Sequence, residues 1–167
     1  MEAIENAVIL GIDPGTLVVG YGALRLTAGG PEFVAAGVLR PRRTATVPER
    51  LGEIGAGLDA LLVDLAPATV VVEEAFVARN VQSALRIGEG RGVALAAATR
   101  YGAGVIQLPP AVAKKTLVGN GAASKEQVAG MVRRLLGLAE VEAVLDATDA
   151  LALALAHAIR GRALRLR

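Results

Sequence analysis

The apolar positions of the chain follow two different spacings, and each spacing predicts a different kind of element. Short apolar runs bounded by Gly, Pro or charged residues predict β-strands. Such runs cover residues 7–12, 18–26, 33–39, 70–72 and 105–108. The first three runs follow one another through short turns, whereas long segments separate the later ones. This order predicts a mixed sheet in which three antiparallel-linked strands are followed by parallel strands.

Apolar residues spaced three and four apart predict helices between and after the later strands. These helices are expected over residues 48–65, 80–101, 111–117, 124–136 and 145–159. Pro48 suits the first turn of a helix, and Ser124 is a good N-cap. We therefore predict an α/β fold with helices on both faces of a five-stranded mixed sheet. A single domain would cover residues 1–159, and a basic C-terminal tail would follow over residues 160–167.

Composition narrows the class of protein. Apolar residues make up 53% of the 167 residues, which is enough for one domain with a sizeable core. The chain has no Cys, so neither a disulfide framework nor a thiolate metal site is expected. No apolar run approaches the roughly 18 residues of a membrane span, and the acidic N-terminus is unlike a signal peptide. We therefore expect a cytoplasmic protein without a membrane partner.

Carboxylates follow the two runs that are expected to be central strands. Asp13 ends the first run, and Glu73 with Glu74 ends the run of valines. Ligands gather at the carboxyl ends of central strands in such sheets. Neighbouring side chains of a strand point to opposite faces, so only one of the two glutamates can join Asp13. Asp146 and Asp149 are three residues apart and therefore share one face of the last helix.

Several carboxylates at one site repel one another unless a cation compensates them. Hard cations such as Mg²⁺ or Mn²⁺ prefer oxygen ligands, and a pair of them clamps the attacking and leaving oxygens of phosphoryl transfer. Taken singly, Asp13 could be a turn residue and Asp146 an N-cap. The set as a whole favours a metal site.

Five segments, spread over roughly residues 7–159, resemble the bacterial RuvC family of Holliday-junction resolvases. Three carry carboxylates: Gly-Ile-Asp-Pro-Gly-Thr at 11–16, Val-Val-Glu-Glu-Ala-Phe at 71–76 and Asp-Ala-Thr-Asp-Ala-Leu-Ala at 146–152. The segment 80–94 resembles the long interface helix of that family, and 112–128 resembles its basic segment. The order and spacing of these segments make the resemblance highly specific.

The resemblance implies a ribonuclease H-like fold and a homodimer that acts in homologous recombination and DNA repair. Such a dimer resolves four-way junction DNA by paired symmetric nicks that leave ligatable 5′-phosphate ends. Carried over by motif position, the metal-binding and catalytic carboxylates are Asp13, Glu73, Asp146 and Asp149, which would hold two Mg²⁺ ions (Mn²⁺ being possible). Asp13 would bridge the two ions. Glu74 departs from the family pattern, which usually has a neutral polar residue there, and is left out of the set.

The same resemblance assigns residues that contact DNA. Lys114 and Lys125 match family lysines that meet the junction near the scissile phosphate, and Lys125 is also placed among the catalytic residues. Phe76 matches an aromatic residue that stacks on bases near the crossover, with Arg79 and Asn80 beside it. The family further implies partnership with a branch-migration motor of the RuvA and RuvB type. In the long helix, Gly88 and Gly92 share one face and could seat a partner helix.

Three other interpretations of the sequence are alternatives to a junction resolvase. Asp-Pro-Gly-Thr also resembles the first phosphate loop of actin-like sugar kinases and chaperone ATPases, but that fold needs two such domains. A RuvC-like nuclease family tied to ribosomal RNA maturation is a closer alternative, against which the lysine segment and the Phe76 loop argue. A non-catalytic junction-binding protein is the third, although no carboxylate of the set is missing.

Overall fold

A mixed sheet forms the centre of the protein. The computed structural model describes residues 6–74, 81–138 and 145–165, except for the side chains of residues 145, 146 and 162–165. The strands are β1 (Val8–Asp13), β2 (Val19–Thr27), β3 (Gly30–Leu39), β4 (Thr69–Glu73) and β5 (Gly104–Leu108), in the order β3-β2-β1-β4-β5. The first three strands pair antiparallel, and β1, β4 and β5 pair parallel. The predicted five-stranded mixed sheet is confirmed.

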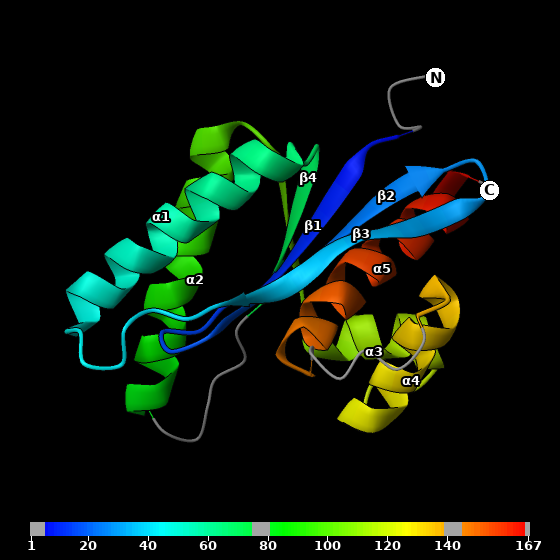
Figure 1. Ribbon diagram of the computed structural model, residues 1–167. Helices are drawn as coiled ribbons and strands as arrows, with labels where there is room; N and C mark the ends of the chain where they lie inside the picture. Colours follow the sequence, from blue (N-terminus) through cyan, green and yellow to red (C-terminus); the bar gives the residue numbers. More distant parts are fainter. Residues whose placement is uncertain (1–5, 75–80, 139–144, 166–167) are drawn as a thin grey trace.

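Helices cover both faces of the sheet (Figure 1). They are α1 (Val47–Leu65), α2 (Val81–Tyr101), α3 (Pro110–Val118), α4 (Lys125–Leu136) and α5 (Leu145–Arg165). One face carries α1 and α2, and the other carries α3, α4 and α5, with α5 lying against β1 and β2. In the described part of the chain, no helix combines the length and the apolar character that crossing a membrane requires.

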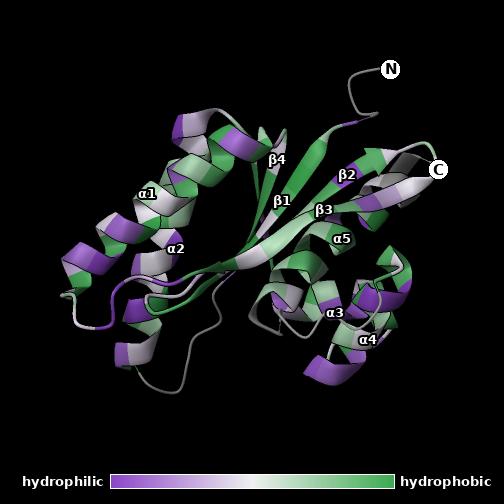
Figure 2. Ribbon diagram, in the orientation of Figure 1, coloured by the Kyte–Doolittle hydropathy of each residue, from purple (hydrophilic) through white to green (hydrophobic). Residues whose placement is uncertain are grey.

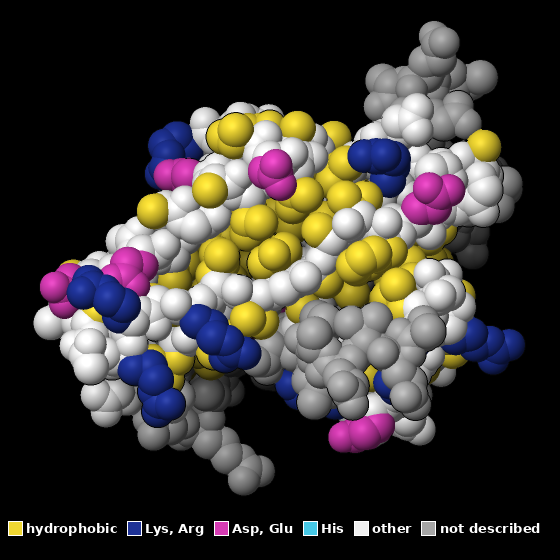
Figure 3. Space-filling model, in the orientation of Figure 1, with side chains coloured by type: hydrophobic (Ala, Val, Ile, Leu, Met, Phe, Trp, Pro, Cys, Tyr) yellow, Lys and Arg dark blue, Asp and Glu magenta, His cyan; other side chains and the backbone are white. Residues whose placement is uncertain are grey.

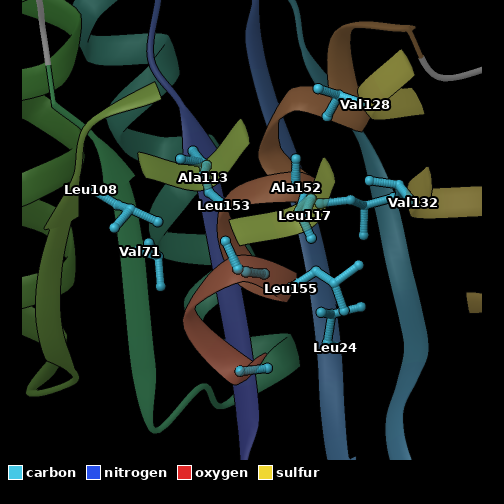
Figure 4. Close-up of a cluster of buried hydrophobic side chains, with 14 of the residues drawn as sticks. Leu24, Val71, Leu108, Ala113, Leu117, Val128, Val132, Ala152, Leu153 and Leu155 are labelled. Atoms are coloured by element: carbon cyan, nitrogen blue, oxygen red, sulfur yellow. The ribbon is translucent and has the colours of Figure 1, made fainter. Parts of the chain in front are cut away.

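The central strands are buried on both faces, as their unbroken apolar sequence predicts (Figure 2). On one face Leu10 and Val72 pack with residues of α1 and α2. Figure 3 shows this apolar cluster reaching the surface between α1 and β3. On the other face Leu24 and Val71 pack with residues of α3, α4 and α5, among them Leu153 and Leu155 (Figure 4).

The last helix approaches the first strand closely because β1 carries a glycine at the crossing point. A Cβ on Gly11 would overlap the backbone carbonyl oxygen of Ala150, and a Cβ on Gly22 would collide with Leu151. Small residues here allow α5 to lie directly on β1 and β2. This contact brings the first turns of α5, with Asp149, close to the carboxyl end of β1, where Asp13 lies.

Two predicted boundaries were wrong by several residues, whereas the others differ from the structure by at most one residue. Strand β3 begins at Gly30, three residues before the predicted Phe33, because Gly30 and Pro31 pair with the end of β2 and are not part of the turn. Pro31 is tolerated there because β3 is an edge strand. Helix α5 extends to Arg165 and does not stop at Ile159, since the arginine-rich sequence that follows favours a helix. Most of the predicted basic tail therefore continues α5.

Candidate metal-binding active site

Asp13 and Glu73 end two neighbouring parallel strands. Ile12 of β1 is level with Val72 of β4, so the two acidic residues that follow lie side by side. Their carboxyl groups hydrogen bond to each other. Glu74, the next residue, is exposed. The expectation that only one glutamate can join Asp13 therefore agrees with the structure, and that glutamate is Glu73.

A third carboxylate comes from α5. Asp149 lies in the first turns of this helix, near enough that its negative charge raises the pKa of Glu73. Asp146 belongs to the first turn of the same helix, one turn before Asp149, and its side chain is outside the described part of the structure. Because α5 begins at Leu145, Asp146 lies within the helix and is not its N-cap.

Glu73 has a strongly perturbed pKa. Burial, the charges of Asp13 and Asp149, and the hydrogen bond to Asp13 together raise the pKa of Glu73 from 4.5 to about 7, with burial as the largest cause. The positive charge of Lys125 acts in the opposite direction. Carboxylates that repel one another in a half-buried site retain a proton at neutral pH unless a cation replaces it.

Lys125 supplies one positive charge at this site. Its ammonium nitrogen lies 2.7 Å from Oδ2 of Asp149, which joins the first residue of α4 to α5. The hydrogen bond and the charge of Asp149 raise the pKa of Lys125, so its side chain is charged at neutral pH. The family resemblance implies that Lys125 lies near the scissile phosphate, and in the structure it contacts Asp149, one of the candidate metal ligands.

The chemistry of this donor set fits divalent cations. Asp13, Glu73 and Asp149 offer hard carboxylate oxygens, and their mutual repulsion is relieved when a cation binds between them. No three His, Asp or Glu side chains in the described ranges already enclose a metal position. Asp149 is engaged by Lys125, and the side chain of Asp146 lies outside the described ranges.

The structure describes only one of the other predicted DNA-contacting residues. Lys114 is half-buried on α3, before the turn that precedes α4 and Lys125. Phe76, Arg79 and Asn80 lie outside the described residues. Their contacts with DNA stay predictions.

Arg91 is a residue at this site to which sequence analysis assigned no role. From α2, its Nε–H donates to the backbone carbonyl oxygen of Glu73 at 3.3 Å, and its guanidinium also contacts the side chain of Gln107 on β5. The only signal in the sequence was a charged residue within the glycine-rich part of the segment that resembles an interface helix. Three-dimensional packing alone brings it to the end of β4.

Comparison with known proteins gives consistent results. The sequence pattern of the family described as "Crossover junction endodeoxyribonuclease RuvC" matches residues 9–157. A protein of that name from Solidesulfovibrio magneticus is 45% identical over 166 residues, covering 99% of this chain and 98% of the relative. One from Chlorobaculum parvum is 41% identical over 157 residues, covering 94% of this chain and 84% of the relative.

Solved structures agree with the sequence relatives. The structure of Thermus thermophilus RuvC superimposes with a TM-score of 0.84 at 36% identity, covering 93% of this chain and 96% of that one. The same protein in complex with a Holliday junction substrate gives a TM-score of 0.83 at 33% identity, with the same coverage. A yeast mitochondrial Holliday junction resolvase, at 16% identity and a TM-score of 0.65, shares the fold. The expected ribonuclease H-like fold is thereby confirmed, and the chain belongs to the RuvC family of crossover junction endodeoxyribonucleases.

Proposed function

We propose that this protein resolves four-way DNA junctions by paired symmetric nicks, in homologous recombination and DNA repair. The observation that carries the proposal is the convergence of Asp13, Glu73 and Asp149 in a chain of the RuvC family. The Thermus thermophilus relative, which has been solved with a Holliday junction substrate, aligns over nearly the whole chain. Each nick would hydrolyse one phosphodiester and leave a 5′-phosphate end that a ligase can seal.

The carboxylates would hold two Mg²⁺ ions, with Mn²⁺ as an alternative. Asp13, at the end of the central strand, would contact both ions, while Glu73 and Asp149 would each complete one shell and Asp146 would act beside Asp149. When bound, the ions would lower the pKa of the attacking water and neutralise charge at the scissile phosphate. Glu73 must lose its proton for this, and Asp149 must exchange its contact with Lys125.

Lys125 would then be available to DNA. Three-quarters of its side chain is exposed, so the ammonium group can turn from Asp149 to a phosphate oxygen without unfolding the N-terminus of α4. A compact charge on a long stem suits contact with phosphate without reading sequence. Lys114 would add a second phosphate contact. Phe76 would stack on bases near the crossover, with Arg79 and Asn80 on the neighbouring backbone or base edges.

A homodimer would provide two such sites for two strands. The helix α2 exposes the large apolar side chains of Val81 and Leu85, one turn apart. Gly88 and Gly92 continue the same side of the helix, and a Cβ at either position would have no neighbour within 4 Å. An apolar strip with small residues suits close packing of a second helix. We define Val81, Leu85, Gly88 and Gly92 as the partner face.

The family resemblance also suggests a partner complex and a cellular location. A branch-migration motor of the RuvA and RuvB type would deliver the junction, and the protein would act in the cytoplasm, where chromosomal DNA is accessible.

A synthetic mobile four-way junction with each strand labelled in turn tests the proposal. With Mg²⁺, the protein should cut two strands of like polarity at symmetric positions, and a ligase should seal the products. A linear duplex of the same sequence and a structured RNA serve as matched substrates. Cuts that are asymmetric, or confined to RNA, would overturn the proposal and favour the alternative in ribosomal RNA maturation. Tight junction binding without any cut would favour a non-catalytic junction-binding protein.

A further inference from the structure

The backbone carbonyl of Glu73 lies at a position where the sheet cannot supply its usual partner. The N–H of Glu74 donates to the carbonyl oxygen of Leu108 at 3.0 Å, so residue 74 directs its backbone groups toward β5. Successive residues of a strand direct these groups to opposite neighbours, and Glu73 therefore directs its carbonyl toward β1. In the register of β1 and β4, the donor expected for that oxygen is the backbone nitrogen of residue 14.

Residue 14 is a proline, and proline has no backbone N–H. Pro14 is buried, so water is poorly placed to replace the missing donor. A buried carbonyl without a partner is costly, and the chain satisfies such groups almost everywhere. Here the guanidinium of Arg91 supplies the hydrogen bond, with its Nε–H 3.3 Å from the Glu73 oxygen.

Arg91 is itself held in place from two directions. Its guanidinium contacts the amide oxygen of Gln107 on β5, the strand beyond β4. The preceding residue, Gly90, packs against the turn after β1: a Cβ there would lie 2.6 Å from the carbonyl oxygen of Gly15. The same stretch of α2 thus contacts the ends of both strands that carry candidate metal ligands.

We propose that Arg91 is a positioning residue that fixes the end of β4, and hence the Glu73 carboxylate, by replacing the donor that Pro14 cannot provide. The kinetic part of this inference rests on the proposed function, whereas the hydrogen bond itself does not. Catalytic groups displaced by an ångström lose rate steeply. Since Arg91 and the partner face belong to one helix, the contact also connects the surface proposed for dimerisation with the metal site.

A double-substitution cycle tests the replacement directly. Arg91→Ala removes the side-chain donor, Pro14→Ala restores a backbone donor, and the double variant combines them. Arg91→Ala should slow single-turnover cleavage of a four-way junction by about 10- to 100-fold. It should also weaken binding of Mg²⁺, measured by calorimetry without DNA, while junction affinity in the absence of Mg²⁺ stays within about twofold. Adding Pro14→Ala should recover most of the rate and of the metal affinity.

The matched control is Arg86→Ala, which removes a partly exposed arginine from the same helix, paired only with Glu89 among the contacts described. It should change neither rate nor metal affinity. The carbonyl ¹³C resonance of Glu73, measured without metal or DNA, gives a readout independent of nuclease activity. It should shift in Arg91→Ala and return toward its original position in the double variant.

Two results would overturn the inference. In the first, Arg91→Ala lowers the cleavage rate and the Mg²⁺ affinity by the same factors whether or not Pro14→Ala is also present. In the second, the Glu73 carbonyl resonance does not shift in Arg91→Ala. If Arg91→Ala fails to fold, Gln107→Ala replaces it in the same cycle. This variant keeps Arg91 but removes the side chain that its guanidinium contacts, so smaller losses of cleavage rate and Mg²⁺ affinity are expected. A protein that cuts no junction would refute the proposed function, and the resonance and calorimetry would still decide the role of Arg91.

Discussion

The ammonium nitrogen of Lys125 lies 2.7 Å from Oδ2 of Asp149, so the proposed metal site contains a cation contributed by the chain itself. One carboxylate oxygen cannot accept a hydrogen bond from an ammonium group and coordinate a metal ion equally well at the same time. Lys125 is largely exposed at the start of α4, whereas Asp149 is a quarter exposed and fixed on the core helix α5. The lysine is therefore the partner that moves when a metal binds.

This relationship gives Lys125 two opposing effects on activity. Replacing it by Met removes a competitor of the metal at Asp149 and also a charge expected to contact the scissile phosphate. We predict that Lys125→Met lowers the single-turnover rate by about 10- to 100-fold, which corresponds to the loss of one charge-assisted hydrogen bond in the transition state. The Mg²⁺ concentration needed for half the maximal rate should not rise. A metal titration of cleavage measures both quantities. A large rise in the Mg²⁺ requirement would show that Lys125 assists metal binding and does not compete with it.

Protonation of Glu73 predicts an unusual dependence of stability on pH. In the unfolded chain this carboxyl loses its proton near its ordinary pKa of 4.5, whereas in the folded protein the pKa is about 7. The folded state thus binds more protons between these values, and the contribution of Glu73 to the free energy of unfolding falls as pH rises through this window. Without metal, Glu73→Gln should therefore raise Tm at pH 8 and have little effect at pH 4.

Thermal unfolding in a chelator measures this difference, and the exposed neighbour Glu74 provides the control. Glu74→Gln should leave Tm nearly unchanged at both pH values. Adding Mg²⁺ should raise Tm of the unsubstituted protein more than that of Glu73→Gln, because the metal replaces the proton. If Glu73→Gln were equally destabilising at pH 4 and pH 8, burial and the neighbouring carboxylates would not raise the pKa of Glu73 as described above.

The partner face predicts the oligomeric state. Leu85 is 63% exposed on α2, and an Asp there would place a charge in the proposed helix–helix contact. We expect Leu85→Asp to convert a dimer into a monomer in light scattering, and to replace paired cuts by slow, unpaired ones. Leu135→Asp, at an exposed leucine of α4, should remain dimeric. A monomeric unsubstituted protein that still cuts both strands in concert would contradict the proposed dimer.

The order of apolar runs was sufficient to predict the sheet, and the carboxylates that end two of these runs predicted that acidic side chains meet at the carboxyl ends of the central strands. The choice of Glu73 over Glu74 and the metal-binding role of Asp149 came from the family resemblance. Strand β3 was predicted to begin too late, because Gly30 and Pro31 look like a turn until the pairing with β2 is known. The end of α5 was placed too early, because the basic residues there are compatible with either a helix or a frayed end.

Two contacts at the site were beyond sequence analysis because they join distant segments. The Lys125–Asp149 pair spans two helices, and the resemblance had suggested only that Lys125 meets DNA. The Arg91–Glu73 contact depends on the backbone direction at the end of β4 and on the proline opposite it. Secondary-structure propensities and sequence motifs describe side chains, whereas the hydrogen-bond acceptor of Arg91 is a backbone oxygen. Neither could therefore have predicted this contact.

The central claim is that Asp13 acts in cutting DNA at a four-way junction and not in holding it. Asp13→Asn keeps the size and hydrogen-bonding capacity of the side chain but removes the negative charge that a metal ion requires. We predict that this variant binds a synthetic four-way junction with unchanged affinity, while Mg²⁺-dependent nicking under single-turnover conditions falls by at least about 10³-fold. Nicking that persists at the original rate in Asp13→Asn would contradict the account.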